Sequence, residues 1–202
     1  MKNKIQQCIG AIKTFAYTLV SGKLKRSSQF DKKLDGRKIN TTFNKNESKM
    51  TYSPTTVANY FIEKYSKNGE LTPMKLLKLT YIAYGWYLAV TDNKEKLLNE
   101  QPVAWNLGPV FPSLYSNIKK SYSDLIIKKK IPTLVSEQIS KKDEGFLDKI
   151  WTIYGKHDGV YLSALTHQSG TPWSDVYCKE CNSILSDESI YNHYKAKLNP
   201  VK

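Results

Sequence analysis

The stretch between residues 74 and 90 constrains the fold more than any other part of the chain. After Lys78 it carries no charged side chain until Asp92, and apolar or aromatic residues occupy nearly all sides of the predicted helix. A helix that is apolar all round is buried, either inside a protein or in a membrane. This one is too short and too rich in polar aromatic residues to span a bilayer. We therefore expect a compact helical domain around a buried central helix.

Several helix-start signals surround this segment and predict a mainly α fold. At residues 53–54 and 72–73, a capping side chain precedes a proline at the first helical position. The first of these helices is expected to end at Gly69, since glycine commonly follows the last helical turn. A further helix is expected at residues 113–120. Other predicted helices begin after Ser140, Asp158 and Ser186, and the first two of these end near Gly155 and Gly170.

Two short extended segments complete the predicted domain. Three prolines and a glycine within residues 99–112 exclude a regular helix, so we expect an extended piece at 102–105 and a turn at 106–109. Residues 125–131 are β-prone at both ends and are a candidate short strand. The predicted fold is thus mainly α with one or two short β-strands.

The positive charge of the chain is concentrated at its amino terminus. Residues 1–50 contain 12 Lys or Arg and 3 Asp or Glu, whereas residues 51–202 contain 19 and 15. Most of the net charge of +13 therefore lies in the first quarter of the chain. Such an arm favours an anionic partner, which could be nucleic acid, an acidic protein face or a membrane surface.

The amino-terminal arm has two parts that precede a helical domain at residues 51–202. Apolar residues recur at steps of three and four in residues 1–20, which predicts an amphipathic helix. This helix could pack on the protein's own body, dock on a partner or lie on a membrane. Residues 21–50 hold few apolar side chains and are predicted to be a flexible basic linker. The candidate docking residues are Ile5, Ile9, Ile12, Phe15 and Leu19.

The basic residues of the linker support an alternative function, a DNA-binding autoregulator. Lysine and arginine can hold phosphates, and the affinity would then fall steeply with salt. Aromatic residues are sparse in this segment, so recognition of bases by stacking is poorly supported. The candidate phosphate ligands are Lys23, Lys25, Arg26, Lys32, Lys33, Arg37 and Lys38.

No motif indicates an enzyme or a cofactor. Cys178 and Cys181 have the spacing of zinc ligands, but no second such pair exists, and we interpret them as two ordinary thiols and weak metal candidates. His167 lacks an acidic residue at an orienting spacing, which is typical of a structural histidine. Phosphate-binding loops and nucleophile-elbow motifs are absent. We expect no catalytic residue, no cofactor and no metal.

The amino terminus does not predict secretion. Its apolar run is interrupted by Gln6, Gln7 and Lys13, and no small-residue cleavage site is convincing. We therefore predict a cytoplasmic protein without a membrane partner.

An ordered set of motifs resembles the Panacea-domain family, also described as SocA-like phage-associated proteins. The first is the central helix, Met-Lys-Leu-Leu-Lys-Leu-Thr-Tyr-Ile-Ala-Tyr-Gly-Trp-Tyr-Leu-Ala at 74–89. The second is Pro-Val-Ala-Trp-Asn-Leu-Gly-Pro-Val-Phe-Pro-Ser-Leu-Tyr at 102–115. The third joins Phe-Leu-Asp-Lys-Ile-Trp at 146–151 to Leu-Thr-His-Gln-Ser-Gly-Thr-Pro-Trp at 165–173. The resemblance covers residues 50–175, and the ordered set is more specific than any one motif.

This resemblance implies a non-enzymatic antitoxin of a bacterial or prophage type II toxin–antitoxin pair. Members of the family neutralise diverse toxins, usually by direct protein–protein binding, and some act as adaptors that present the toxin to a protease. The expected partner is a toxin encoded next door, with operator DNA and a protease as alternatives. Neither residues 1–49 nor the two cysteines belong to the family pattern. The predicted partner-binding residues of the domain are Trp105, Gly108, Pro109, Val110, Tyr115, His167 and Trp173. For Trp105 and Trp173, a scaffold role is favoured over direct contact with the partner.

Overall fold

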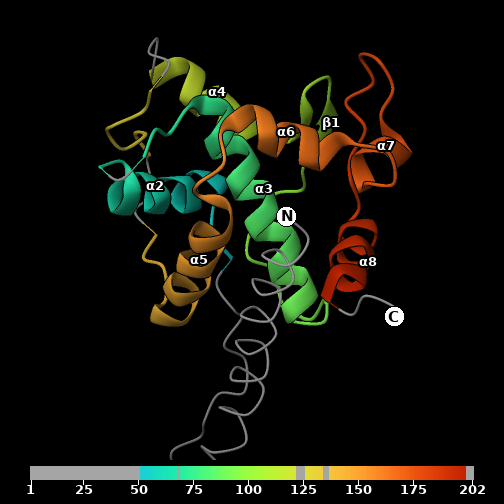
Figure 1. The fold of residues 1–202 in the computed structure, drawn as a ribbon, viewed down its shortest axis with the longest axis horizontal. Helices are drawn as coiled ribbons and strands as arrows, with labels where there is room; N and C mark the ends of the chain where they lie inside the picture. The colour runs from blue at the N-terminus through green and yellow to red at the C-terminus, as the bar shows by residue number, and fades with distance from the viewer. Residues whose placement is uncertain (1–50, 68, 122–125, 134–136, 199–202) are drawn as a thin grey trace, which may run out of the picture.

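The computed structural model describes residues 51–67, 69–121, 126–133 and 137–198 (Figure 1). The predicted amphipathic helix at 1–20 and the basic linker at 21–50 lie outside the described residues, as do their candidate docking and phosphate-binding side chains. In the described part of the chain, seven helices and one two-stranded sheet confirm the mainly α prediction. The helices are α2 (Pro54–Tyr65), α3 (Pro73–Val90), α4 (Pro112–Ser121), α5 (Lys141–Tyr154), α6 (Gly159–His167), α7 (Pro172–Val176) and α8 (Asp187–Leu198).

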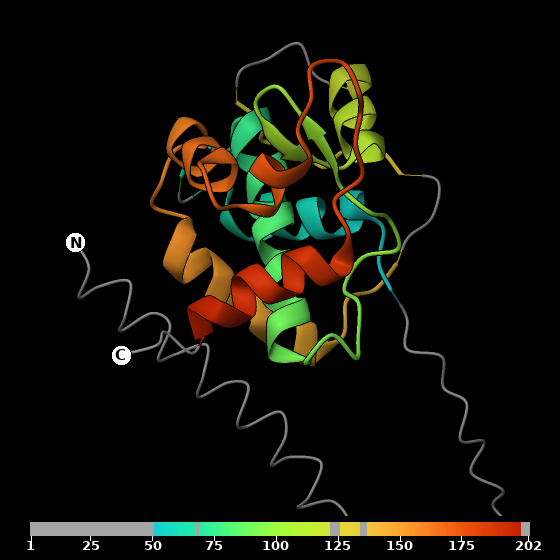
Figure 2. The same cartoon turned by 90° about the vertical axis from the view of Figure 1, so that its right-hand side faces the viewer.

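Helix α3 is the buried centre of the domain, as its sequence predicted. All of its residues from Lys75 to Val90 are buried. The helix begins after Thr72, whose hydroxyl accepts a hydrogen bond from the backbone N–H of Lys75 at 3.2 Å, and Pro73 takes the first helical position. Helices α2, α4, α5, α6 and α8 all pack against α3, which passes through the middle of the molecule (Figure 2). No helix in the described ranges is long and apolar enough to cross a membrane.

Helix α8 approaches α3 at a glycine. A Cβ atom added to Gly85 would overlap the ring of Tyr194, so the two helices can pack this closely only where α3 has no side chain. The same tyrosine ring lies edge-on to Trp86, with 5.2 Å between ring centroids. This contact anchors the carboxyl-terminal helix on the central one.

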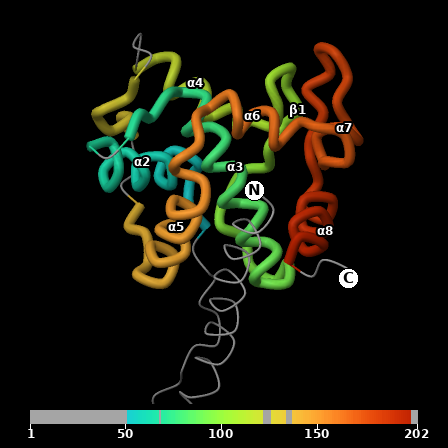
Figure 3. Tube along the Cα trace, viewed as in Figure 1, coloured from blue at the N-terminus to red at the C-terminus, as the bar shows by residue number. Residues whose placement is uncertain are grey.

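A β-hairpin lies at one end of α3, and its strands are β1 (Val103–Trp105) and β2 (Gly108–Val110). The strands are antiparallel, with Val103 opposite Val110. A third segment runs along the free edge of β1, where the N–H of Ala104 donates to the carbonyl of Ser183 at 2.8 Å. The chain trace shows this segment rising beside the hairpin between α7 and α8 (Figure 3). Residues far apart in sequence therefore meet at the hairpin.

Most predicted helix starts are confirmed, since Ser53, Thr72, Ser140 and Asp158 all cap their helices. The predicted end of the first helix is wrong, because α2 ends at Tyr65 rather than near Gly69. Helix α7 was not predicted, although Thr171 and the following proline repeat the same start signal.

The predicted strand at residues 125–131 is wrong, because residues 126–131 form no strand. The side chain of Asn59 takes the place of a neighbouring strand there. Its Nδ2 donates to the carbonyl of Ile131 at 2.9 Å, and its Oδ1 accepts from the N–H of Ile131 at 2.8 Å. The second strand lies instead at Gly108–Val110 and overlaps the end of the segment predicted to be a turn, residues 106–109.

Candidate partner-binding surface

Two buried side chains hold the turn of the hairpin in place. Lys78 of α3 donates from Nζ to the carbonyl of Pro109 at 3.0 Å, and Ser163 of α6 donates from Oγ to the carbonyl of Leu107 at 2.7 Å. Burial lowers the pKa of Lys78 to about 7. Gly108 has a φ of 103°, and a Cβ added there would lie 2.7 Å from the Lys78 nitrogen. The close approach of the hairpin to α3 therefore requires glycine at this position.

A continuous set of ring contacts and one hydrogen bond links aromatic residues across the hairpin and its neighbours. The rings of Trp105 and Tyr115 meet edge to face at 4.9 Å between centroids. Trp173 donates from Nε1 to the carbonyl of Trp105 at 2.7 Å, stacks on Tyr177 at 4.3 Å and meets the edge of His167 at 5.2 Å. With the neighbouring turn residue, these side chains form what we call the aromatic face. The aromatic face consists of Trp105, Leu107, Tyr115, His167, Trp173 and Tyr177.

The aromatic face is partly open to solvent. Leu107 is 56% exposed and Tyr115 is 39% exposed, although both are large and apolar. The other four residues are half-buried. In Figure 1 the elements that carry them, the hairpin with α4, α6 and α7, lie along one edge of the molecule. Tryptophan and tyrosine are enriched among the residues that contribute most to binding in protein interfaces.

A cavity of about 440 Å³ lies beside the aromatic face, between the hairpin and the loop that follows α7. Tyr177 crosses this gap and donates from its hydroxyl to Oδ1 of Asn106 at 3.1 Å. The Nε1 atom of Trp105 is buried and has no hydrogen-bond partner within the described residues. The cavity is lined by Ala104, Trp105, Asn106, Tyr177, Lys179, Glu180 and Asn182.

The structure brings together four of the predicted partner-binding residues, Trp105, Tyr115, His167 and Trp173, from four different elements. The other three, Gly108, Pro109 and Val110, make up the whole of β2 and are buried, so they can only support the surface. Whether any of these residues binds a partner stays a prediction. Leu107 and Tyr177 were not predicted. The spacing of four residues between Trp173 and Tyr177, typical of side chains that meet on one helix face, could have indicated the second.

His167 is held from within its own helix. Its Nδ1–H donates to the carbonyl of Ser163 at 2.5 Å, and a carbonyl can only accept, which fixes the position of the proton. The ring edge rests against Trp173. These contacts support the interpretation of His167 as a structural histidine that keeps the indole of Trp173 in place.

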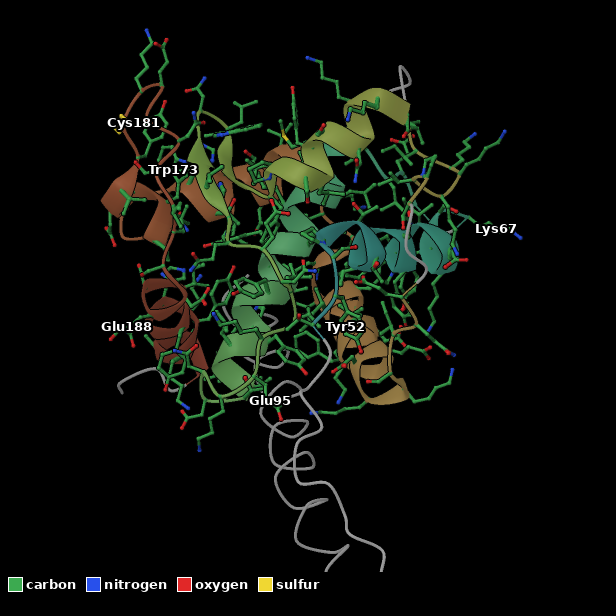
Figure 4. All side chains as sticks on the ribbon, turned by 180° about the vertical axis from the view of Figure 1, so that it is seen from behind. Tyr52, Lys67, Glu95, Trp173, Cys181 and Glu188 are labelled. Carbon is green, nitrogen blue, oxygen red and sulfur yellow. A yellow bond between two sulfur atoms is a disulfide. The ribbon has the colours of Figure 1, made fainter. Side chains whose placement is uncertain are left out.

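The interpretation of Cys178 and Cys181 as two ordinary thiols is wrong, because the structure joins them in a disulfide. A tight turn brings their Cα atoms to 5.5 Å, within the range that a disulfide can bridge. Both cysteines are exposed, and Figure 4 shows Cys181 at the same corner of the molecule as Trp173. The described residues contain no group of three His, Cys, Asp or Glu side chains that could hold a metal ion.

Comparison with known proteins identifies one match. Residues 76–174 match the family model described as antitoxin SocA-like, Panacea domain. This span begins inside α3 and ends inside α7, so it contains the hairpin and all of the aromatic face except Tyr177. The disulfide lies outside the span. No curated protein and no solved structure matches the chain.

Proposed function

From the premise that residues 76–174 form a Panacea domain of the SocA-like antitoxin family, we propose that this protein neutralises a cognate toxin by direct protein–protein binding through the aromatic face. The observation that carries the proposal is the uninterrupted contact chain from Tyr115 through Trp105 and Trp173 to Tyr177. In this function the protein occupies the surface of the toxin and catalyses no reaction itself.

The rigidity of the aromatic face supports this proposal. Association costs free energy for every side chain that must be ordered, and a surface that is already ordered avoids part of this cost. Hydrogen bonds fix the backbone of the hairpin at two carbonyl groups: Lys78 donates to that of Pro109, and Ser163 donates to that of Leu107. The indole of Trp173 donates a hydrogen bond to Trp105, stacks on Tyr177 and meets the ring of His167 edge-on. A toxin would therefore meet a preformed surface.

The charge distribution supports binding by shape and apolar contact. Toxin sites that handle nucleotides or tRNA are typically electropositive, and the domain itself carries a small positive excess, 19 Lys or Arg against 15 Asp or Glu in residues 51–202. The domain therefore cannot bind such a toxin by mimicking its anionic substrate. Exposed Leu107 and Tyr115 provide apolar area instead.

Two tyrosines of nearly equal exposure provide a matched test. Tyr115 is 39% exposed and contacts Trp105, whereas Tyr161 is 41% exposed and stacks on His157 at 4.1 Å, outside the aromatic face. We expect Tyr115→Ala in the full chain to weaken neutralisation of the neighbouring gene product by at least tenfold when the two proteins are co-expressed. A tenfold loss of affinity corresponds to about 1.4 kcal/mol of binding free energy. Tyr161→Ala should leave it unchanged. Equal effects of the two variants would show that the toxin binds elsewhere.

The predicted amphipathic helix at residues 5–19 is proposed as a second docking element, tethered by the linker at high effective concentration. Replacing Ile9 and Ile12 by Asp in the full chain should then reduce neutralisation while the unfolding of the domain stays the same. A chain beginning at Met50 that neutralises as well as the full chain would exclude this role.

The alternative, a DNA-binding autoregulator, rests on the 12 Lys or Arg in residues 1–50. Its affinity for operator DNA should fall steeply as salt rises from about 50 mM to 200 mM. Absence of any mobility shift at the lower salt concentration excludes it.

A further inference from the structure

The loop that carries the disulfide is anchored firmly at both ends but weakly in between. At its start, the N–H of Tyr177 donates to the carbonyl of Trp173 at 2.9 Å. At its end, the carbonyl of Ser183 accepts from Ala104 of β1 at 2.8 Å. Between these anchors, the N–H of Cys181 reaches the carbonyl of Cys178 only at 3.3 Å. The covalent bond between the two sulfur atoms is therefore the main constraint on residues 178–182, which we call the disulfide loop.

The backbone of the disulfide loop adopts conformations that its residues do not favour. Glu180 has a φ of 65° and Asn182 has a φ of 50°, both in the left-handed region. Side chains with a Cβ atom make this region unfavourable, more so for glutamate than for asparagine. Both residues, with Lys179, line the cavity beside the aromatic face. The shape of one cavity wall thus depends on a loop that would relax if its constraint were removed.

We propose that the Cys178–Cys181 disulfide is a site of reversible thiol–disulfide exchange with a dithiol reductant. Reduction releases the disulfide loop from the cavity, and this loosening weakens binding of the toxin at the adjacent aromatic face. The second statement rests on the proposed function, whereas the first concerns this chain alone.

The chemistry requires only access to the sulfur atoms, and both cysteines are exposed. A thiolate of the reductant attacks one sulfur, the bond between the two sulfurs breaks, and a mixed disulfide forms while the other cysteine leaves as a thiolate and takes up a proton. The second thiol of the reductant then displaces the protein sulfur. The protein gains two electrons and two protons as two thiols, and the reductant becomes a disulfide.

The location of the anchors indicates that reduction acts locally. The backbone hydrogen bonds from the N–H of Tyr177 and to the carbonyl of Ser183, and the stacking of Tyr177 on Trp173, do not involve sulfur, so they persist in the reduced protein. Disulfides in a reducing cytoplasm, where we expect this protein to act, are typically transient or redox-sensing rather than structural. The fold therefore remains while one wall of the cavity changes.

Proteolysis tests the first statement without any toxin, because Lys179 is a trypsin site between the two cysteines. The full chain with Cys8→Ser is used oxidised, or after treatment with dithiothreitol, blocking with iodoacetamide and desalting. Mass spectrometry then follows cleavage after Lys179. We expect cleavage roughly tenfold faster in the reduced protein, because proteolysis tracks the population of the open loop. The Cys178→Ser/Cys181→Ser variant should be cleaved at the fast rate with or without reductant. Equal rates in oxidised and reduced protein overturn the proposal.

Calorimetric titration with the product of the neighbouring reading frame tests the second statement. We expect roughly tenfold weaker binding by the reduced protein and by the double serine variant, since several lining side chains must then be ordered on binding. Equal affinity of both forms overturns the link between the disulfide and the aromatic face but leaves the proposed function intact. If neither form binds, the proposed function fails, and the proteolysis result alone decides whether the disulfide controls the loop.

Discussion

The indole nitrogen of Trp173 donates a hydrogen bond of 2.7 Å to the backbone carbonyl of Trp105, across a sequence separation of 68 residues. This bond joins α7 to the end of β1, next to the turn of the hairpin. The bond holds α7 and β1 together, although no helix or sheet hydrogen bonds connect these two segments. The exposed part of the aromatic face is therefore built on a fixed base.

Replacement of Trp173 by Phe removes this bond and leaves the carbonyl of Trp105 without its donor. We expect the free energy of unfolding to fall by about 1–2 kcal/mol, the usual cost of an unsatisfied partly buried group. Urea unfolding followed by circular dichroism measures this change. Trp151→Phe is the control, because the ring of Trp151 acts through stacking on Tyr65 at 4.3 Å, and a phenyl ring can retain that contact. A loss for Trp173→Phe no greater than that for Trp151→Phe would mean that the bond contributes nothing measurable.

Two glycine-to-alanine substitutions should have opposite effects on stability. Gly108 has a φ of 103°, and a new Cβ would lie 2.7 Å from Lys78 Nζ, so Gly108→Ala should destabilise the protein by about 1–3 kcal/mol. Gly145 lies inside α5 with nothing within 4 Å of an added Cβ, so Gly145→Ala should stabilise it by about 0.5–1 kcal/mol. Thermal unfolding of both variants checks the two signs together. Unchanged or increased stability of Gly108→Ala would argue against the conformation described for the hairpin turn, and a loss in Gly145→Ala would argue against the open space beside α5.

Burial of Lys78 should make stability depend on pH. Its pKa is lowered to about 7 in the folded protein from an ordinary value of 10.5. Between these values the unfolded chain binds a proton that the folded protein does not, so stability rises with pH. The wild type should therefore gain up to about 1.4 kcal/mol per pH unit between pH 7 and 9 relative to Lys78→Met.

Unfolding in urea at several pH values measures this difference. Lys75 and Lys197 also have lowered pKa values, caused mainly by burial, and subtraction of the variant removes their contributions. The range stops at pH 9 because burial raises the pKa of several tyrosines, including Tyr81 and Tyr84, which begins to favour the unfolded chain near pH 10. Parallel pH profiles for the two proteins would show that Lys78 keeps its charge.

The contact of α8 with α3 predicts a strong effect at Gly85. A Cβ at this position overlaps the ring of Tyr194, which is itself buried, so Gly85→Ala should cost about 1–3 kcal/mol through displacement of α8. The double variant Gly85→Ala/Tyr194→Leu should recover part of this loss, because the smaller side chain leaves room for the methyl group. A double-mutant cycle in thermal unfolding measures the coupling. If the losses of the two single variants add without coupling, the cost of Gly85→Ala does not come from overlap with the ring of Tyr194.

Local rules in the sequence were sufficient where the physical cause is local. The N-terminal caps at Ser53, Thr72, Ser140 and Asp158 depend on a hydroxyl or carboxylate three residues from a backbone N–H, and the sequence states that spacing directly. The absence of charge along α3 likewise predicted its burial on all sides.

Local rules failed where a distant group decided the structure. Residues 126–131 have strand-like composition, but the amide of Asn59, more than 60 residues earlier in the sequence, satisfies the backbone of Ile131 in place of a strand. Similarly, Cys178 and Cys181 carry no signal that separates two thiols from a disulfide. The backbone turn that brings their Cα atoms to 5.5 Å decides this.

The sequence by itself determined that the chain folds around an apolar central helix, because burial and helix capping follow from residue type and spacing. Its residues 76–174 also match the family model of the SocA-like Panacea domain. It also named Trp105, Tyr115, His167 and Trp173 as candidates without indicating that they touch. Only the tertiary structure decided that they form one surface, added Leu107 and Tyr177, and placed the disulfide loop beside them. The reason is that these contacts join residues from separate helices and strands, whose distances are set by the packing of the whole domain around α3.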